Sequence, residues 1–549
     1  MRHSEISDRI SLTDISDTVF SIGELLCRTH REYADSIAIE FGGKAFSHAQ
    51  LELLCGRMAK GLSNLNIGPS EHVAIQLGNS LDFVVALLGT LMAGIIPVVL
   101  SPLLPVSRVR EQLRGKPIRA IIASEDRSVP TGRESITIIC DVAGSLAEAD
   151  LFEITEIGKK KRRRSSEIPI RELMDNDGIY RPSRVENPRE EVAAILFTGG
   201  TTGEAKGVML THGNFSAATE VWARQLTGPS VNGRARLLCV LPLFHIFGLT
   251  VALLASIRAG VQIILRRKFD AVRTLSDIQS KRVSILLGVP TMYSMLLSFS
   301  TLRTYDLSSL EYCAVGGAPA TDALIDGMRV KTGIVLRTAY ALTETTSTGA
   351  HQLPFGDPVM PTAGKVAPGN IVETVAVEDG MKLLAPGSVG EICFRGPHVF
   401  KGYWDRPQDT RAAFLGDRFH TGDVGYVRED GYLVILDRKK DMLLCGGHNV
   451  YPRLIENALT QHPAIQEAAV IGIADPTFGE RPKAFLVIRE GEEIPTADEL
   501  LEFLWPRLAR YEIPVVFERR TILPKTPVGK LDRAKLREGE RSKMSLVFP

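Results

Sequence analysis

Glycines, hydroxyl side chains and a lysine are concentrated in residues 198–207, which read TGGTTGEAKG. A glycine-rich loop lets backbone N–H groups approach an anion closely, and a lysine adds a positive charge. The loop directly follows EVAAILF, an apolar run typical of a buried strand. This arrangement predicts a phosphate-binding loop, with a purely structural turn as the alternative. It is not a Walker A loop, because Lys206 lies between Ala205 and Gly207 instead of between glycine and Ser or Thr.

Short apolar runs alternate with longer segments of helical periodicity along most of the chain. HVAIQLGN precedes LDFVVALLGTLMAG, RLLCVLPL precedes GLTVALLASIRAG, and VSILLGVP precedes TMYSMLLSF. Such alternation predicts parallel sheets covered by helices, which is an α/β architecture. Shorter β-like pieces such as TVAVED and GYLVILD come later, and an α+β segment begins near NVYPRLIENAL. The charged stretch LDRKKDMLLCGG, residues 436–447, is the predicted boundary between these regions.

Length and composition are ordinary for a soluble globular protein with more than one domain. A chain of 549 residues exceeds the size of a single core, so at least two domains are expected. The net charge of +1 provides no overall attraction to nucleic acid. The seven cysteines include no C-x-x-C pair, which argues against a disulfide framework or a zinc site. Because the N-terminus also lacks the apolar core of a signal peptide, we expect a cytoplasmic protein.

Two segments leave alternatives open. The run from Phe83 to Val106 is long and apolar enough for a membrane span, but Pro97, Pro102 and Pro105 interrupt its second half. A buried helix, a glycine stop and a buried strand are therefore favoured over a transmembrane segment. The basic run KKKRRR, residues 159–164, is expected to form a solvated loop. Its alternative is contact with anionic lipid or nucleic acid, and the lipid contact would place the protein peripherally at a membrane.

Six further motifs follow the phosphate loop along the chain. They are LPLFHIFG (241–248), VGGAP (315–319), YALTE (340–344), HTGDVG (420–425), DRKKDMLLCGGHNVYP (437–452) and PKTPVGK (524–530). In this order the seven motifs resemble the signatures of the adenylate-forming superfamily. That superfamily contains acyl-CoA synthetases, aryl-CoA ligases, luciferases and the adenylation domains of peptide synthetases. TGGTTG and DRKKDM particularly resemble the fatty acyl-CoA synthetase branch, whereas most other branches carry a serine where Gly199 stands here.

The resemblance implies both an architecture and a reaction. The expected N-terminal domain, residues 1–437, combines two parallel α/β subdomains with a small β-barrel. A smaller, mobile α+β domain, residues 441–549, follows a hinge at about residues 438–442, and its pivot is Lys440. The implied reaction activates a carboxylic acid with ATP and Mg²⁺ to an acyl-AMP and then transfers the acyl group to CoA. ATP, Mg²⁺ and CoA are therefore the expected cofactors and cosubstrates.

Position within the motifs assigns expected roles to individual residues. The implied ATP and AMP contacts are Thr198, Gly199, Gly200, Thr201, Thr202, Gly203, Lys206, Gly316, Gly317, Ala318, Tyr340, Asp423 and Arg438. Of these, Tyr340 resembles the residue stacked on adenine, and Asp423 and Arg438 resemble the ribose contacts. Thr343 resembles the α-phosphate contact and Glu344 the Mg²⁺-associated carboxylate, while a helix cap is the structural alternative for this pair. Gly446 and Gly447 resemble the segment along which the pantetheine of CoA slides.

Lys530 and His245 resemble the two remaining functional groups. Lys530 in PKTPVGK resembles the catalytic lysine, whose ammonium group bridges the attacking carboxylate and the α-phosphate. The matching lysine is acetylated in several bacterial relatives, so a lysine acetyltransferase and a deacylase are implied partners. His245 resembles a gate between the acyl pocket and the phosphate site. Its structural alternative is a core histidine with satisfied hydrogen bonds.

The sequence gives fewer indications of which carboxylic acid is the substrate. Ala341 and Phe247 are expected in the acyl pocket, and Ala341 stands where long-chain and aryl branches usually carry glycine. Because acetyl-specific relatives close this position with tryptophan, the alanine predicts an open, slightly shallower pocket. A medium- to long-chain fatty acid is favoured, with an aryl or dicarboxylic acid next. No arginine is recognisable from the sequence as a partner for a distal carboxylate.

Two other functional classes remain as alternatives. A carrier-loading enzyme would pass the acyl group to a protein-bound phosphopantetheine, but no fused carrier segment is visible. A non-catalytic regulatory protein would be expected to lose charged groups of the site. Glu344, Asp423, Arg438 and Lys530 are all present, which favours catalysis. The oligomeric state is not predicted.

Overall fold

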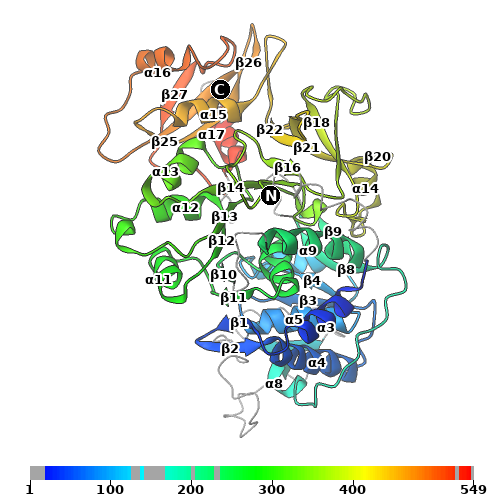
Figure 1. The fold of residues 1–549 in the computed structure, drawn as a ribbon. Coiled ribbons are helices and arrows are strands. Elements are labelled where there is room, and N and C mark those ends of the chain that lie inside the picture. Colours follow the sequence, from blue (N-terminus) through cyan, green and yellow to red (C-terminus); the bar gives the residue numbers. More distant parts are fainter. Residues whose placement is uncertain are drawn as a thin grey trace.

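The computed structural model describes most of the 549 residues. The described ranges are 19–124, 136–140, 167–198, 205–227, 235–525 and 531–545. Three predicted segments therefore lie outside the described residues: Gly199 to Gly203 of the phosphate loop, the basic run at 159–164, and Lys530. Figure 1 shows the described chain as two stacked α/β layers, with a smaller C-terminal domain at one end.

The first sheet carries the strand that precedes the phosphate loop. Its order is β19-β9-β8-β4-β3-β5-β6-β7, and the strands from β8 through β7 pair in parallel. Their bounds are β3 (His72–Gln76), β4 (Ile96–Val99), β5 (Ile118–Ser124), β6 (Ile136–Cys140), β7 (Glu167–Pro169), β8 (Val192–Phe197), β9 (Gly207–Thr211) and β19 (Gly402–Tyr403). The helices of this half are α3 (Ile22–Glu32), α4 (His48–Asn64), α5 (Leu81–Met92), α6 (Val106–Leu113) and α8 (Ile170–Leu173).

The second sheet begins as a parallel array. Its strands are β1 (Ile37–Phe41), β2 (Lys44–Ser47), β10 (Arg236–Cys239), β11 (Gln262–Leu265), β12 (Ile285–Gly288), β13 (Tyr312–Val315) and β14 (Leu336–Tyr340). One face packs under α11 (Ala271–Lys281), α12 (Pro290–Leu297) and α13 (Asp322–Thr332). The other face packs in the main core, together with α9 (His212–Leu226) (Figure 1). The predicted strand and helix alternation is thus confirmed as two helix-covered sheets.

The predicted barrel region is a set of antiparallel strands continuous with β14. These strands are β15 (Ala350–His351), β16 (Gly364–Val366), β17 (Ile371–Val375), β18 (Gly390–Arg395), β20 (Phe414–Leu415), β21 (Arg418–Val427) and β22 (Tyr432–Arg438), with helix α14 (Pro407–Ala413) beside them. The pairing runs from β14 through β15, β16 and β22 to β21, β18 and β17. This continuity brings residues of β21 and β22 next to the end of β14.

The C-terminal domain has its own sheet and core. It contains β23 (Leu443–Cys445), β24 (His448–Val450), β25 (Ile465–Asp475), β26 (Gly479–Ile488), β27 (Val516–Arg519), α15 (Pro452–Thr460), α16 (Ala497–Leu504) and α17 (Arg533–Ser545). Its buried apolar residues form clusters separate from the core of the larger domain. The model therefore has the large N-terminal and smaller C-terminal domains expected for the fold class.

The long apolar segment at residues 83–106 forms a helix and then a strand, as its glycine and prolines predict. Every residue of α5 is buried, Gly94 has a φ of 68°, and β4 follows. A left-handed residue ends the helix, and glycine adopts that conformation without steric cost. Across the described part of the chain, no helix has the length and apolar character needed to span a bilayer.

The segment GLTVALLASIRAG departs from the regular helix that its pattern suggests. Phe247–Ala255 forms a π-helix (η1), and only the short α10 (Ser256–Arg258) is α-helical. Gly248 packs so closely on Pro242 that a Cβ there would lie 2.2 Å from the Pro242 carbonyl oxygen. Wide helical turns are uncommon and are frequent at functional sites. This one begins two residues after His245.

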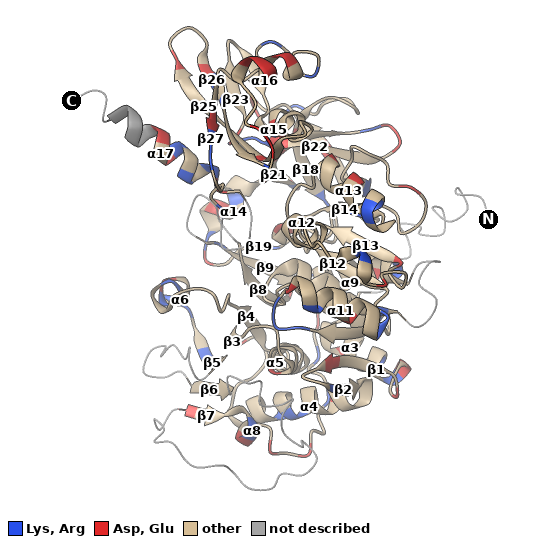
Figure 2. Cartoon of the chain, turned by 90° about the vertical axis from the view of Figure 1, so that its left-hand side faces the viewer, with Lys and Arg blue, Asp and Glu red and all other residues tan. Residues whose placement is uncertain are grey.

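The cysteines are unpaired and the surface charges are of both signs, as the sequence predicts. All seven cysteines are buried and unpaired. Burial raises the pKa of the Cys239 and Cys313 thiols to about 12, which keeps them protonated and unreactive. Figure 2 shows Lys and Arg interspersed with Asp and Glu along the surface helices.

Five buried histidines predict acid destabilisation of the larger domain. Burial lowers the pKa of His30 to about 3 and those of His48, His212, His351 and His398 to about 4. The unfolded chain binds protons near pH 6.5, so this stability is complete above that pH and is lost as pH falls toward 4. At pH 5 each histidine is expected to cost about 2 kcal/mol. The thermal unfolding midpoint should fall steeply and reversibly between pH 7 and 5, and an unchanged midpoint would contradict this prediction.

Candidate active site

The predicted nucleotide residues gather where strands of the two sheets end. Gly316, Gly317 and Ala318 follow β13, Tyr340 ends β14, and Thr198 directly follows β8. Ligands of open α/β sheets bind beyond the carboxyl ends of the strands. The fold thus places these motifs at the edge where such a site is expected.

A backbone and side-chain pair closes the base of the phosphate loop. Thr198 N–H donates to the Lys206 carbonyl at 3.0 Å, and Lys206 N–H donates to Thr198 Oγ1 at 3.2 Å. The flanking strands β8 and β9 pair antiparallel, with Phe197 opposite Gly207. The loop therefore spans a β-hairpin, so its two ends are held together regardless of what binds within it.

Lys206 is held by residues that the sequence motifs did not identify. Its ammonium nitrogen lies 2.7 Å from Asp409 Oδ1 of α14 and 4.9 Å from the centre of the Tyr403 ring. The lysine lowers the pKa of the Asp409 carboxyl. Asp409 and Tyr403 are about two hundred residues away in sequence. The only sequence signal near them is the turn-rich stretch KGYWDRPQDT, residues 401–410, which carries no chemistry by itself.

Glu344 is a largely enclosed carboxylate in the 3₁₀ turn η3 (Thr343–Thr345). Tyr403 donates its hydroxyl hydrogen to Glu344 Oε1 at 2.9 Å. Burial raises the pKa of Glu344, and the Tyr403 hydrogen bond opposes that shift. The next residues, Thr346 and Ser347, have φ values of 50° and 60° and are buried. Such left-handed conformations of non-glycine residues cluster at functional sites.

Tyr340, Asp423 and Arg438 form one hydrogen-bonded group. Tyr340 Oη donates to Asp423 Oδ2 at 2.6 Å, and Arg438 Nε donates to Asp423 Oδ1 at 2.8 Å. Asp423 and Arg438 face each other in the register of β21 and β22. The Asp423 charge raises the pKa of Arg438, and burial raises that of Tyr340 well above its usual value. Each carboxylate oxygen still has a second acceptor site, so Asp423 can accept hydroxyl donors as well.

His245, Phe247 and Ala341 lie around the same strand ends. His245 Nδ1 accepts from Phe247 N–H at 3.3 Å, and the backbone of His245 donates to Pro242 at 3.1 Å. A Cβ placed on Gly316 would lie 3.4 Å from the Phe247 ring. Ala341 comes directly after β14. The structure therefore brings Phe247 close to the glycines that follow β13.

The predicted hinge residues have contacts on both sides of the domain boundary. Lys439 Nζ lies 3.0 Å from Glu391 of β18, in the larger domain. Asp441 Oδ1 accepts from Arg537 of α17, in the smaller domain, at 3.0 Å. Lys440 lies between these two anchored residues and is exposed.

The glycine pair of the predicted pantetheine segment forms a tight hairpin turn. Gly446 and Gly447 join β23 to β24, with Cys445 paired opposite His448. Their φ values are 57° and 82°. A two-residue hairpin turn with both φ values positive strongly favours glycine. A Cβ on Gly446 would also lie 2.9 Å from the Phe478 ring.

The carboxylates of the site are compatible with Mg²⁺ bound together with a nucleotide. Within the described ranges, no cluster of three or more His, Cys, Asp or Glu side chains is arranged to hold a metal ion. Nucleotide sites usually hold Mg²⁺ by one or two carboxylates plus substrate phosphates and water. Glu344, largely enclosed and hydrogen bonded through Oε1 to Tyr403, fits that requirement.

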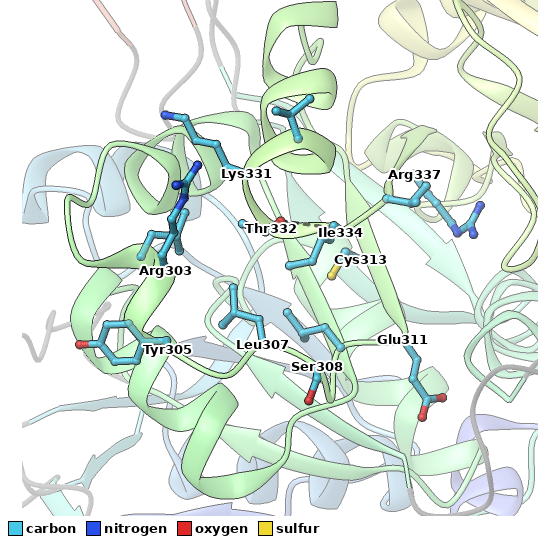
Figure 3. Close-up of a pocket in the computed structure, with 15 residues that line it drawn as sticks. Arg303, Tyr305, Leu307, Ser308, Glu311, Cys313, Lys331, Thr332, Ile334 and Arg337 are labelled. Carbon is cyan, nitrogen blue, oxygen red and sulfur yellow. Dashed lines mark hydrogen bonds between the residues drawn. The ribbon is translucent and has the colours of Figure 1, made fainter.

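A separate pocket of about 650 Å³ lies away from these residues (Figure 3). Its lining includes Glu311, which precedes β13, Gly333 and Ile334, which precede β14, and Arg337 near the start of β14. These are the amino ends of the strands whose carboxyl ends carry the nucleotide residues. The pocket is therefore at the opposite edge of the sheet.

Comparison with known families identifies the chain. The family of AMP-binding enzymes matches residues 26–404. The C-terminal domain of AMP-binding enzymes matches residues 454–530. The chain is an AMP-binding enzyme. The first match alone covers more than half of its length.

This AMP-binding enzyme is similar to proteins of established activity. It is 33% identical over 535 residues to the long-chain-fatty-acid–CoA ligase of Bacillus subtilis, covering 95% of this chain and 94% of that one. It is 31% identical over 518 residues to a feruloyl-CoA synthase of an Amycolatopsis species, covering 94% and 98%. A solved structure of o-succinylbenzoate coenzyme A synthetase (MenE) from Bacillus subtilis, with ATP and magnesium ion, matches with a TM-score of 0.76. The two chains are 28% identical, and the match covers 93% of this AMP-binding enzyme and 99% of that structure.

With Glu344 as the predicted Mg²⁺ ligand, Tyr403→Phe is expected to raise the Mg²⁺ concentration that ATP binding requires. The change removes the hydroxyl that donates to Glu344 but keeps the ring beside Lys206. Groups that orient a metal ligand typically contribute ten- to hundredfold to metal affinity, so about a tenfold higher Mg²⁺ requirement is expected. Calorimetric titration with ATP over a range of Mg²⁺ concentrations measures it. Tyr432→Phe, on β22 beside Arg428, is the control. Equal Mg²⁺ dependence of ATP binding in Tyr403→Phe and in the native protein would contradict the prediction.

Proposed function

We propose that this AMP-binding enzyme is an AMP-forming acid–thiol ligase that joins a medium- to long-chain fatty acid to CoA. In the first step a carboxylate oxygen attacks the α-phosphorus of ATP, the bond to pyrophosphate breaks, and acyl-AMP forms. In the second step the CoA sulfur attacks the acyl carbon, the bond to AMP breaks, and the thiol proton leaves to solvent. The single observation that carries the proposal is the group joining Tyr340, Asp423 and Arg438 at the strand ends of an AMP-binding fold.

The nucleotide is held by residues from both sheets. The Asp423 carboxylate, fixed by Tyr340 and Arg438, accepts the ribose hydroxyls, and the Tyr340 ring packs on adenine beside Gly316, Gly317 and Ala318. The phosphate loop, with Lys206 and the hydroxyls of Thr198, Thr201 and Thr202, binds the β- and γ-phosphates. Binding of ATP replaces the contact between Lys206 and Asp409 by contacts with phosphate. Thr343 contacts the α-phosphate, and Glu344 would hold Mg²⁺, which would supply positive charge for the leaving pyrophosphate.

The two steps use different positions of the C-terminal domain. In the first, Lys530 places its ammonium group between the attacking carboxylate and the α-phosphate, where charge develops. Rotation about Lys440 then withdraws Lys530 and brings the Gly446 and Gly447 turn to the site as a path for pantetheine. Support for this pivot is that Lys439 binds the larger domain while Asp441 binds the smaller one. A few backbone angles between two anchored residues suffice for such a hinge.

The acyl chain enters beside Phe247 and Ala341, and His245 separates this pocket from the phosphates. Similarity to a long-chain-fatty-acid–CoA ligase along nearly the whole chain favours a fatty acid. An aryl acid is the second candidate, because a feruloyl-CoA synthase is nearly as similar. The seven unpaired cysteines favour a reducing compartment such as the cytoplasm.

Acetylation of Lys530 would regulate the enzyme at its first step. Neutralising the ammonium group removes the charge that stabilises adenylation, while transfer from preformed acyl-AMP continues. Full adenylation activity in protein carrying acetyl-lysine at this position would contradict the regulatory role.

Acid-dependent exchange of pyrophosphate with ATP tests the proposed function. A panel of fatty, aromatic and dicarboxylic acids is supplied with Mg²⁺ and labelled pyrophosphate, without CoA. Exchange that requires an acid of the panel is the expected result. Absence of exchange with every acid would contradict the proposal and favour a non-catalytic protein.

A further inference from the structure

Arg337 of β14 lies on the same face of the sheet as the proposed acyl pocket. Pleating places alternate strand residues on opposite faces, and Ala314 pairs with Arg337 in register. Tyr312 and Ala314 belong to the main core with Phe247, whereas Cys313 and Leu336 belong to the core under α11, α12 and α13. Figure 3 shows Arg337 at the border of the separate pocket, with its side chain extending away from Cys313 and Ile334.

Small residues lead along this face from the strand ends toward Arg337. Ala314 lies on this face of β13, and Gly316 directly follows that strand. Arg337 and Ala339 lie on this face of β14, and Ala341 directly follows it. The Phe247 ring lies against the Gly316 position. From Ala341 to Arg337 the strand covers about 13 Å, at roughly 3.3 Å per residue. A chain lying on this face from the reacting carboxylate would reach Arg337 after that distance.

The Arg337 guanidinium is buried and only partly hydrogen bonded. Its residue exposure is 7%, and Nη2 donates to the Gly356 carbonyl at 3.0 Å. Nη1 is buried without a hydrogen-bond partner among the described residues. Asp357, the acid whose charge acts on Arg337, is itself paired with Arg329 at 2.7 Å. Burying a cation without an acidic partner costs a large desolvation free energy. A bound anion next to Arg337 would offset that cost.

Tyr312 adds a second polar group, and it interacts electrostatically with Arg337. Its hydroxyl oxygen accepts from Gln225 Nε2 at 3.3 Å, which leaves its own hydrogen available for donation. Gln225 is fixed in turn by the Gln352 carbonyl at 2.7 Å. Arg337 and Tyr312 thus form a buried donor group, at the end of a face otherwise made of small and apolar residues.

From these contacts we propose that the preferred substrate is a dicarboxylic acid whose distal carboxylate binds Arg337 and Tyr312. The proposal rests on the proposed ligase function, and it replaces the monocarboxylic fatty acid by a chain that carries a second carboxylate at its far end. The first carboxylate reacts with ATP at the strand ends, and the methylene chain lies over Ala339 and Ala314. A guanidinium binds a carboxylate in a bidentate geometry, which the unpartnered Nη1 permits.

Turnover of matched mono- and diacids by the native enzyme is the first test. AMP release with CoA is measured for dodecanoic and dodecanedioic acids, with shorter and longer members of both series. We expect kcat/KM to be at least about tenfold higher for a medium-length diacid than for the matched monoacid. Turnover of monoacids with no diacid preference would overturn the inference and leave the ligase function standing. Absence of turnover with every acid would overturn both.

Substitution of Arg337 is the second test. Arg337→Met keeps an unbranched apolar stem but removes the guanidinium group and its charge, and kcat/KM for the diacid should fall about a hundredfold. The ratio of kcat/KM for the diacid to that for the monoacid should therefore fall, and ATP binding like that of the native enzyme shows that the variant is folded. Arg337→Lys should recover part of the diacid activity, and Arg329→Met is the control for the neighbouring surface pair. Equal losses for both acids in Arg337→Met would overturn the inference, because they would indicate a purely structural arginine.

Discussion

Lys530→Ala is expected to reduce acyl-AMP formation by about a thousandfold, because the variant lacks the charge proposed to stabilise the transition state. The second half-reaction should be nearly unchanged, since the proposed rotation withdraws Lys530 from the site before CoA reacts. Pyrophosphate exchange measures the first step. Conversion of synthetic acyl-AMP and CoA to thioester measures the second.

Lys525→Ala provides the matched control for Lys530. Lys525 lies five positions earlier in the same motif and pairs with Glu467 at 2.7 Å, away from the nucleotide residues. We expect activity close to that of the native enzyme in both half-reactions. Equal loss of both half-reactions in Lys530→Ala would contradict the proposal that Lys530 acts in acyl-AMP formation but not in thioester formation.

Glu344→Gln is expected to lower adenylation by at least about a hundredfold. Glutamine keeps the shape of the side chain but cannot neutralise a divalent cation, so pyrophosphate leaves without charge compensation. The loss should come from kcat and from the Mg²⁺ dependence, because the substitution leaves Tyr340 and Asp423, the proposed adenine and ribose contacts, in place. ATP titrations at several Mg²⁺ concentrations separate these contributions.

The surface variant Glu186→Gln controls for a general loss of negative charge, since Glu186 pairs with Arg184 in an exposed position. Native-like Mg²⁺ dependence in Glu344→Gln would show that another group holds the metal. Loss of ATP binding at every Mg²⁺ concentration would instead indicate that Glu344 mainly supports the fold of η3.

Local pattern was sufficient to predict the elements that position the site. The segment from Phe83 onward contains the glycine and prolines that interrupt a helix. The helix α5, the turn at Gly94 and the strand β4 could therefore be predicted from local sequence. EVAAILF similarly predicts β8 before the phosphate loop. The π-helix at Phe247–Ala255 was not predicted, because its apolar residues are equally compatible with an α-helix and the wide turn depends on packing against Pro242.

Residues that act across sequence-distant elements were not predictable from one sequence. Tyr403 and Asp409 contact Glu344 and Lys206 only because β19 pairs with β9 beside the phosphate loop. Asp423 and Arg438 were both expected at the ribose, but their direct contact depends on the register of β21 and β22. Arg337 was missed because its missing partner becomes visible only once burial and strand face are known.

The most direct test of the central claim is product analysis of single reactions containing enzyme, ATP, Mg²⁺ and an accepted acid, with and without CoA. With CoA we expect acyl-CoA, AMP and pyrophosphate in equal amounts. Without CoA we expect acyl-AMP retained on the enzyme at no more than one equivalent. Release of ADP and phosphate, or acyl-AMP that does not react with CoA, would contradict the account.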